Sequence, residues 1–184
     1  MQRRALALGM MAALVGLGIG AFAPSGWMTA FSRPNWQEVA WPFPQDGWPA
    51  GRAFRCNAAA CGGALDVYVR PKIGLCNCSV GITGDAEVDA VSDVDMLAAD
   101  FTPLGPGERV EMAGMIGLAR PYQLVVPTGG MVHSAGMALS HRCDLVAAAS
   151  VGDAAGTPRA NAAIASLISR AEIAQWLRDQ MGKS

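Results

Sequence analysis

The stretch RCNAAACGGALDVYVRPKIGLCNC, residues 55–78, carries the pattern on which the interpretation of this chain depends. Apolar and polar side chains alternate over residues 64–70, which predicts a half-buried strand that Pro71 ends. Cysteines flank this strand on both sides, at Cys56 and Cys61 before it and at Cys76 and Cys78 after it. Whether such thiols form disulfides or do metal and redox chemistry depends on the compartment in which the protein folds.

The chain has five cysteines, and the fifth is Cys143. Cys76 and Cys78 lie two residues apart in an extended run, so they point the same way, and a bridge between them would close a small strained ring. A bridge between the turn 56–61 and the 76/78 run, or between this region and Cys143, is therefore expected. We predict that at least one structural disulfide joins the turn to one of the three later cysteines. The odd count leaves one thiol outside any intrachain bridge.

The first 24 residues predict export. Arg3 and Arg4 precede an uncharged run, residues 5–23, that is nearly long enough to span a hydrocarbon core of ~30 Å. Arginines in front of such a run keep the N-terminus in the cytoplasm. Residues 21–23 match a signal peptidase site, but Pro24 is expected to hinder cleavage. Residues 1–24 therefore predict a transmembrane signal-anchor in the inner membrane, with the rest facing the periplasm. If cleavage follows Ala23, they are a signal peptide and the protein is secreted to the periplasm.

Residues 25–51 are rich in aromatic residues and proline, which excludes a long helix and predicts a juxtamembrane linker with one strand near residues 37–41. We predict membrane or partner contacts for Trp27, Phe31 and Trp36, since aromatic rings settle at membrane interfaces. The alternative is that Trp36, together with Trp41 and Trp48, covers the sheet.

Residues 52–184 predict a single exported α+β domain with a mainly antiparallel sheet. Further strands are expected at residues 109–116, 122–126, 131–140 and 143–151, with a hairpin at 128–130 and the last strand central. Two C-terminal helices follow. Thr157 and Pro158 begin the first, and a capping box from Ser169 to Glu172 begins the second. The predicted buried face of the second helix consists of Ile173, Trp176, Leu177 and Met181.

An acidic helix is predicted from Asp85 to Leu97. At 100° per residue, Asp85, Asp89 and Asp93 fall on one side and aliphatic residues on the other. We expect the acidic side to be solvated and to offer a docking surface to a basic partner.

Few of the remaining residues are candidates for catalysis or metal binding. The densest reactive cluster is residues 141–144, His-Arg-Cys-Asp, where an arginine would favour a thiolate. His133 and His141 lie in one predicted strand, roughly 26 Å apart, so one site could not easily use both. Cys76 and Cys78 with either histidine could bind Cu(I) or Zn(II), although the spacing is a weak metal signal.

We expect a non-catalytic, membrane-tethered periplasmic accessory or interaction subunit of a membrane protein assembly, without a cofactor. Its partners would be the membrane, through the N-terminal helix, and other protein subunits. The net charge of −1 argues against nucleic acid. The alternative is an exported thiol-redox or metal-handling protein that uses Cys76 and Cys78.

Overall fold

The computed structural model describes residues 34–182 except residues 45, 76 and 128. The signal-anchor expected at residues 1–24 and the contacts expected of Trp27 and Phe31 lie outside the described residues. No helix in the described part of the chain is long and apolar enough to cross a membrane.

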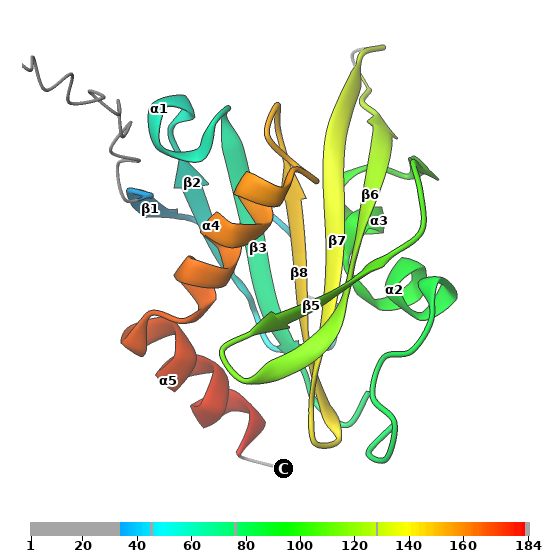
Figure 1. Cartoon of the computed structure of the whole chain (residues 1–184), viewed down its shortest axis with the longest axis vertical. Helices are drawn as coiled ribbons and strands as arrows, with labels where there is room; N and C mark the ends of the chain where they lie inside the picture. The colour runs from blue at the N-terminus through cyan, green and yellow to red at the C-terminus, as the bar shows by residue number, and fades with distance from the viewer. Residues whose placement is uncertain (1–33, 45, 76, 128, 183–184) are drawn as a thin grey trace, which may run out of the picture. The chain divides into compact units, whose positions relative to one another are not determined.

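The predicted α+β class with a mainly antiparallel sheet is confirmed (Figure 1). Eight strands form one sheet in the order β1-β2-β3-β8-β7-β6-β4, and β5 also pairs with β6. Every pairing between these strands is antiparallel. The strands are β1 (Trp36–Val39), β2 (Arg52–Cys56), β3 (Leu65–Lys72), β4 (Asp100–Pro103), β5 (Glu108–Met112), β6 (Met115–Val125), β7 (Met131–His141) and β8 (Asp144–Val151).

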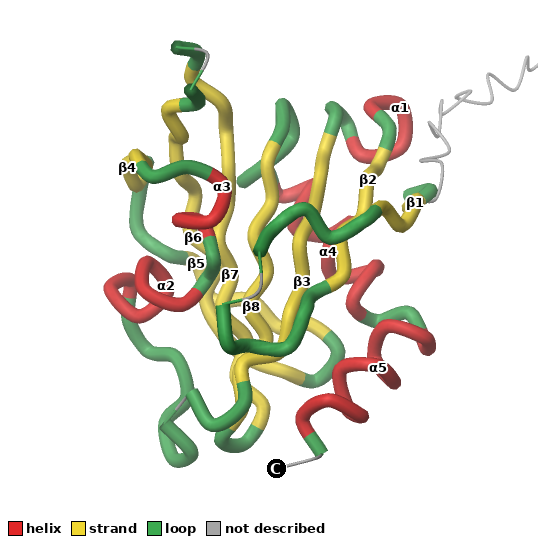
Figure 2. The backbone as a smooth tube through the Cα atoms, turned by 180° about the vertical axis from the view of Figure 1, so that it is seen from behind, coloured by secondary structure: helices red, strands yellow, loops and turns green. Residues whose placement is uncertain are grey.

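Helices lie on both faces of this sheet, as Figures 1 and 2 show from opposite sides. Helices α4 (Pro158–Ile168) and α5 (Ala171–Met181) pack on one face, where they contact β5 and β3. Helices α2 (Asp85–Val91) and α3 (Val94–Leu97) pack on the other, over β6, β7 and β8. A short helix, α1 (Ala58–Cys61), connects β2 to β3.

Strand β3 shows how side-chain alternation builds the two layers. Leu65, Val67 and Val69 belong to the large core beneath α4 and α5, so the residues between them lie on the opposite face of the sheet. The strand continues through Pro71 to Lys72, so the prediction that Pro71 ends it is wrong. Pro71 pairs with Val146 of β8 but lies beyond the last residue paired with β2, so its missing N–H leaves no broken bond on that side.

The predicted hairpin is confirmed by the pairing of β6 with β7, although residue 128 of its turn is outside the described residues. The central position of the last strand is also confirmed, since β8 lies between β3 and β7. The strands predicted at residues 109–116 and 122–126 are only partly confirmed. A turn at Ala113 and Gly114, both with positive φ, separates β5 from a β6 that runs unbroken for 11 residues. Glycine adopts this conformation freely, whereas alanine is seldom found in it. Only one of the two turn residues is therefore of a type that predicts such a turn.

The two C-terminal helices are confirmed, but one predicted cap is not. Thr157 caps α4 by accepting a hydrogen bond from the Ala160 N–H. The capping box predicted from Ser169 is wrong, because Arg170 is the N-cap of α5 and makes no side-chain capping bond. Ile173, Leu177 and Met181 are buried as predicted. Trp176 is only half-buried, with the guanidinium of Arg52 5.6 Å from its ring centre.

Candidate functional site

Two disulfides tie the chain together, from Cys56 to Cys61 and from Cys78 to Cys143. The prediction that the turn 56–61 bridges to a later cysteine is wrong. Helix α1, capped by the Asn57 side chain, brings the Cα atoms of Cys56 and Cys61 within 6.1 Å of each other. The expectation of a bridge from the region 55–78 to Cys143 is confirmed through Cys78. Cys76 lies outside the described residues.

The two disulfides differ in their surroundings. Cys56 and Cys61 are buried in the large core, where their bridge closes a five-residue separation. Cys78 and Cys143 are both exposed, and their bridge joins positions 65 residues apart. An exposed disulfide is open to attack by another thiolate, whereas a buried one is shielded from it.

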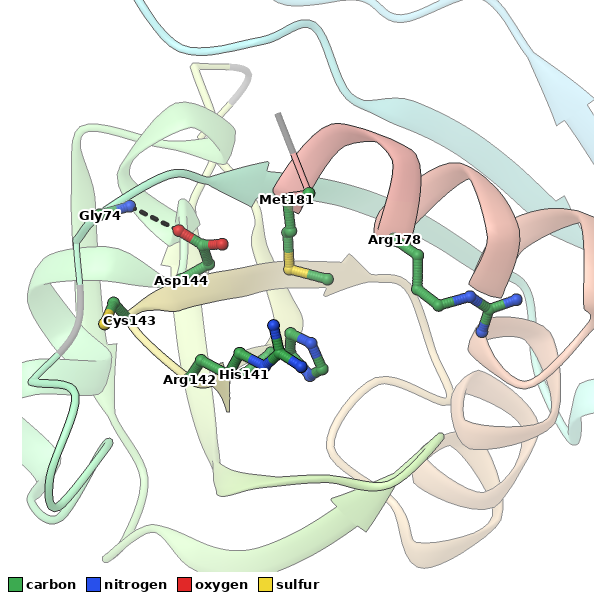
Figure 3. Close-up of a pocket in the computed structure, with 8 residues that line it drawn as sticks. Gly74, His141, Arg142, Cys143, Asp144, Arg178 and Met181 are labelled. Atoms are coloured by element: carbon green, nitrogen blue, oxygen red, sulfur yellow. Dashed lines mark hydrogen bonds between the residues drawn. The ribbon is translucent and has the colours of Figure 1, made fainter. Parts of the chain in front are cut away.

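The Cys78–Cys143 bridge attaches the loop after β3 to the tight turn between β7 and β8. His141 and Asp144 pair across this turn, and Arg142 within it has a φ of 56°. The buried carboxylate of Asp144 also accepts a hydrogen bond from the Gly74 N–H at 2.8 Å, shown in Figure 3. The predicted cluster of residues 141–144 therefore holds the loop after β3 at two points, through the Cys143 disulfide and the Asp144 carboxylate.

A cleft of about 520 Å³ lies beside this turn. Its walls come from the turn, with His141 and Arg142, and from α5, with Arg178 and Met181, as Figure 3 shows. Among the described residues that line the cleft, Asp144 is the only carboxylate, beside the two arginines Arg142 and Arg178. The cleft is therefore cationic, and its volume lies within the range of small-ligand sites.

A second cleft of about 480 Å³ opens near the same disulfide, lined by residues of the loop 78–83 and of the β5–β6 hairpin. Arg142 lines both clefts. Arg109 of β5 and the apolar side chains Val80 and Ile116 also line the second cleft.

The residues of the metal alternative are not brought together. His133 and His141 occupy opposite ends of β7, as predicted, and His133 is exposed and paired with Gln123. Cys78 is held in a disulfide, so in this form it offers no thiolate to a metal. The described residues include no group of three or more His, Cys, Asp or Glu side chains that could hold a metal ion.

A buried ionic cluster lies between the sheet and the helices α2 and α3. The carboxylate of Asp93 accepts hydrogen bonds from Arg70 at 2.6 and 2.8 Å and contacts the Lys72 ammonium at 2.6 Å. Arg70 also forms two 2.8 Å bonds to Asp46 in the proline-rich segment. Burial alone would lower the pKa of Arg70, but its hydrogen bonds to Asp93 and Asp46 outweigh that effect and raise the pKa.

This cluster corrects the predicted acidic helix. The chain does not form one helix from Asp85 to Leu97 but breaks between α2 and α3, where Asp93 has a φ of 65°. The break turns Asp93 into the protein, so it is not an exposed partner contact. The sequence signal that could have predicted this is the pair Arg70 and Lys72. Strand residues two apart share one face, and two cations buried on one face need an acidic partner.

Asp85 and Asp89 also face their own chain. Arg120 of β6 lies 2.5 Å from Asp89 and 3.6 Å from Asp85, and the Tyr122 hydroxyl donates to Asp89 at 2.5 Å. Burial, followed by this bond to Asp89, raises the pKa of Tyr122. The expectation of a fully solvated acidic side is therefore wrong, although Asp85 and Asp89 remain partly exposed.

Trp36 is a core residue. It lies on β1, is 7% exposed and packs in the large core, so the alternative in which it covers the sheet is confirmed. Trp41 also packs on the sheet, edge-on to Phe43 and Tyr68. The described residues of the proline-rich segment, 34–44 and 46–51, therefore pack as part of the domain.

No known family model matches the chain, and no curated protein matches it. One similar solved structure is PA94 from Pseudomonas aeruginosa, a protein of unknown function, with 12% identity over 77% of this chain and 84% of that chain and a TM-score of 0.35.

Proposed function

We propose that this protein is an exported, membrane-tethered accessory subunit that binds other proteins at the periplasmic face of a membrane assembly and does not itself catalyse a reaction. The observation that carries the proposal is the pair of disulfides. Stable structural disulfides are rare in cytosolic proteins and common in exported ones. The apolar run of residues 5–23 supplies the means of export.

The position of the two clefts supports an interaction role. Pro34, where the described chain begins, lies next to Trp36 at the sheet end that also holds α1, whereas the β7–β8 turn lies at the opposite end (Figure 1). Both clefts beside the Cys78–Cys143 bridge therefore lie at the opposite end of the sheet from the start of β1.

Three measurements on the intact protein in cells test export and tethering. The protein should stay in carbonate-washed membranes, be degraded by protease added to spheroplasts, and give both disulfide-linked peptides when alkylated and digested without reductant. Deletion of residues 5–23 should abolish all three results. Protection from protease with all five thiols free would contradict the proposal.

Thiol–disulfide exchange is a second candidate, favoured by the exposure of the Cys78–Cys143 bridge and by Cys76 two residues away in the sequence. An exchange protein should equilibrate this bridge with a glutathione buffer while Cys56–Cys61 stays oxidised, and Cys76→Ser should slow the exchange. If both bridges resist the buffer equally, the accessory function alone remains.

A further inference from the structure

We propose that the second cleft, between the loop 78–83 and the β5–β6 hairpin, is a docking groove for an extended partner segment that carries both acidic and apolar side chains. This inference rests on the proposed interaction function and identifies its surface and the chemistry of its partner. The segment would place carboxylates against two arginines and an apolar side chain between Val80 and Ile116.

The apolar side chains of the groove are unusually exposed to solvent. Val80 is 63% exposed and Ile116 is 45% exposed, and both are among the few large apolar side chains that the described chain leaves in solvent. They line the same cleft, Val80 from the loop and Ile116 from β6. Burial of such a pair by a partner side chain would remove apolar surface from water on both sides of the contact.

The charged part of the groove is cationic. Arg109 and Arg142 line it, and the described lining residues include no Asp or Glu. Arg109 has no carboxylate within ion-pair distance among the described residues. Glu111, two residues along β5, is exposed and shares the strand face of Arg109, but it does not line the groove. A guanidinium matches a carboxylate through two parallel hydrogen bonds, so acidic side chains suit this site.

The walls are held in place before any partner binds. The Cys78–Cys143 bridge attaches one end of the loop to the β7–β8 turn, and the Ser140 hydroxyl accepts a hydrogen bond from the Ile82 N–H at 2.9 Å. Between them, Gly81 has a φ of 64°, and a Cβ there would lie 2.6 Å from the Ser140 oxygen. A preformed groove avoids the entropy cost of ordering a loop on binding.

Charge and shape together select a peptide over other ligands. Nucleic acid needs a basic stripe, whereas this groove has two arginines in a chain of net charge −1. A small inorganic anion would pair with Arg109 but would leave Val80 and Ile116 exposed. An extended peptide can present acidic side chains on one face and apolar side chains on the other.

Fluorescence anisotropy with the full-length protein in neutral detergent tests the groove. The probe is a labelled peptide of alternating Glu and Leu, compared with peptides of Gln and Leu, of Lys and Leu, and of Glu and Ser. The Glu–Leu peptide should bind about tenfold more tightly than each comparison peptide, and more weakly at high salt. Equal binding of the Glu–Ser peptide would reduce the site to non-specific charge attraction and overturn the proposal, as would no binding at all.

Variants locate the binding. Arg109→Glu and Val80→Asp should each weaken binding of the Glu–Leu peptide about tenfold, because each introduces a carboxylate into the groove. Both residues are exposed, and an unchanged melting temperature would confirm folding. The matched control is Arg178→Glu, which makes the same charge reversal in the neighbouring cleft and should leave binding within about twofold. An equal loss in the control would overturn the assignment to this groove.

In cells, a photo-crosslinking residue in place of Val80 should attach to a protein segment that carries Asp or Glu beside an apolar residue. Crosslinks to nucleic acid, or to a second copy of this chain, would overturn the proposal. The groove and the tether can fail separately. A protein found loose in the cytoplasm that still binds the Glu–Leu peptide retains the groove without the tether, and a tethered protein that ignores the peptide shows the reverse.

Discussion

Arg70 of β3 holds the carboxylate of Asp93 through two hydrogen bonds, from Nε at 2.6 Å and from Nη2 at 2.8 Å, although the two residues are 23 positions apart. Lys72 adds a second cation to the same carboxylate, and Asp46 adds a second carboxylate to Arg70. Two positive and two negative side chains therefore balance each other between the sheet, the α2–α3 break and the proline-rich segment. The cluster therefore joins three parts of the chain that are far apart in the sequence.

Removal of Asp93 should destabilise the domain strongly. Asp93→Ala leaves Arg70 and Lys72, both buried, with Asp46 as the one remaining carboxylate of the cluster, and the free energy of unfolding should fall by about 3–5 kcal/mol. Asp93→Asn tests the charge separately, because asparagine tolerates the positive φ found here. Exposed Asp95→Asn is the control and should change stability by less than about 0.5 kcal/mol. Denaturant unfolding measures all three, and equal values for the two asparagine variants would contradict the prediction.

The proline-rich segment should detach from the sheet in acid. The hydrogen bond from Arg70 lowers the pKa of Asp46 below its ordinary value of 3.8. The unfolded chain therefore takes up this proton first, so the stabilisation is complete above the ordinary pKa and is lost as pH falls through the lower folded value. Tryptophan emission, followed from about pH 5 to about pH 2, should report movement of Trp41 away from Tyr68. The change should vanish in Trp41→Phe. Asp46→Asn has no carboxylate to titrate, so its emission should already resemble that of the acid form at about pH 5.

Neither tyrosine should ionise at its ordinary pH in the folded protein. The chain has two, and burial is the largest cause that raises the pKa of both Tyr68 and Tyr122. Each therefore adds stability that is complete below its ordinary pKa of 10.0 and is lost as pH rises through its folded pKa. At the ordinary pKa of 10.0, phenolate absorbance should be weak in native protein and about half of its maximum in denaturant. Tyr122→Phe should also cost about 1.5–3 kcal/mol, because it removes a hydrogen bond to the charged Asp89.

The two disulfides should contribute unequally to stability. In the chain-entropy description, a bridge across 65 residues stabilises by about 4 kcal/mol and one across five residues by about 2 kcal/mol. The double variant Cys78→Ala with Cys143→Ala should therefore lose more stability than Cys56→Ala with Cys61→Ala. Urea unfolding of both variants measures the difference. The reverse order would show that burial of the Cys56–Cys61 bridge outweighs its short loop.

Helix α5 should depend on Leu177 more than on Trp176. Leu177 is fully buried, and Leu177→Ala should cost about 2–5 kcal/mol. Trp176 is half-buried beneath Arg52, so Trp176→Ala should cost less than the ~3–5 kcal/mol expected for a fully buried tryptophan. The melting temperatures of the two variants give the comparison. A larger loss at Trp176 would mean that its contact with Arg52 holds the helix in place.

Local patterns in the sequence were sufficient for much of the fold. Alternation predicted β3, the apolar run from Leu145 to Ala149 predicted a central strand, and Thr157 with Pro158 predicted the start of α4. Each of these signals acts within a few residues, through side-chain alternation or through a cap on the nearest free N–H groups. The sequence also identified residues 141–144 as the densest reactive cluster, which the structure places beside the cationic cleft.

The tertiary structure decided which of these residues meet. Cys56 pairs with Cys61 because a single helical turn closes between them, and Cys78 pairs with Cys143 because the loop after β3 reaches the β7–β8 turn. The acidic pattern 85–97 predicted a solvated helix, but the cations on β3 draw Asp93 inward and break the helix there. Periodicity describes which side of an element a residue takes. A buried charge or a disulfide, in contrast, depends on a partner brought near by the folding of distant segments, because its energy comes from that contact and not from its neighbours in the chain.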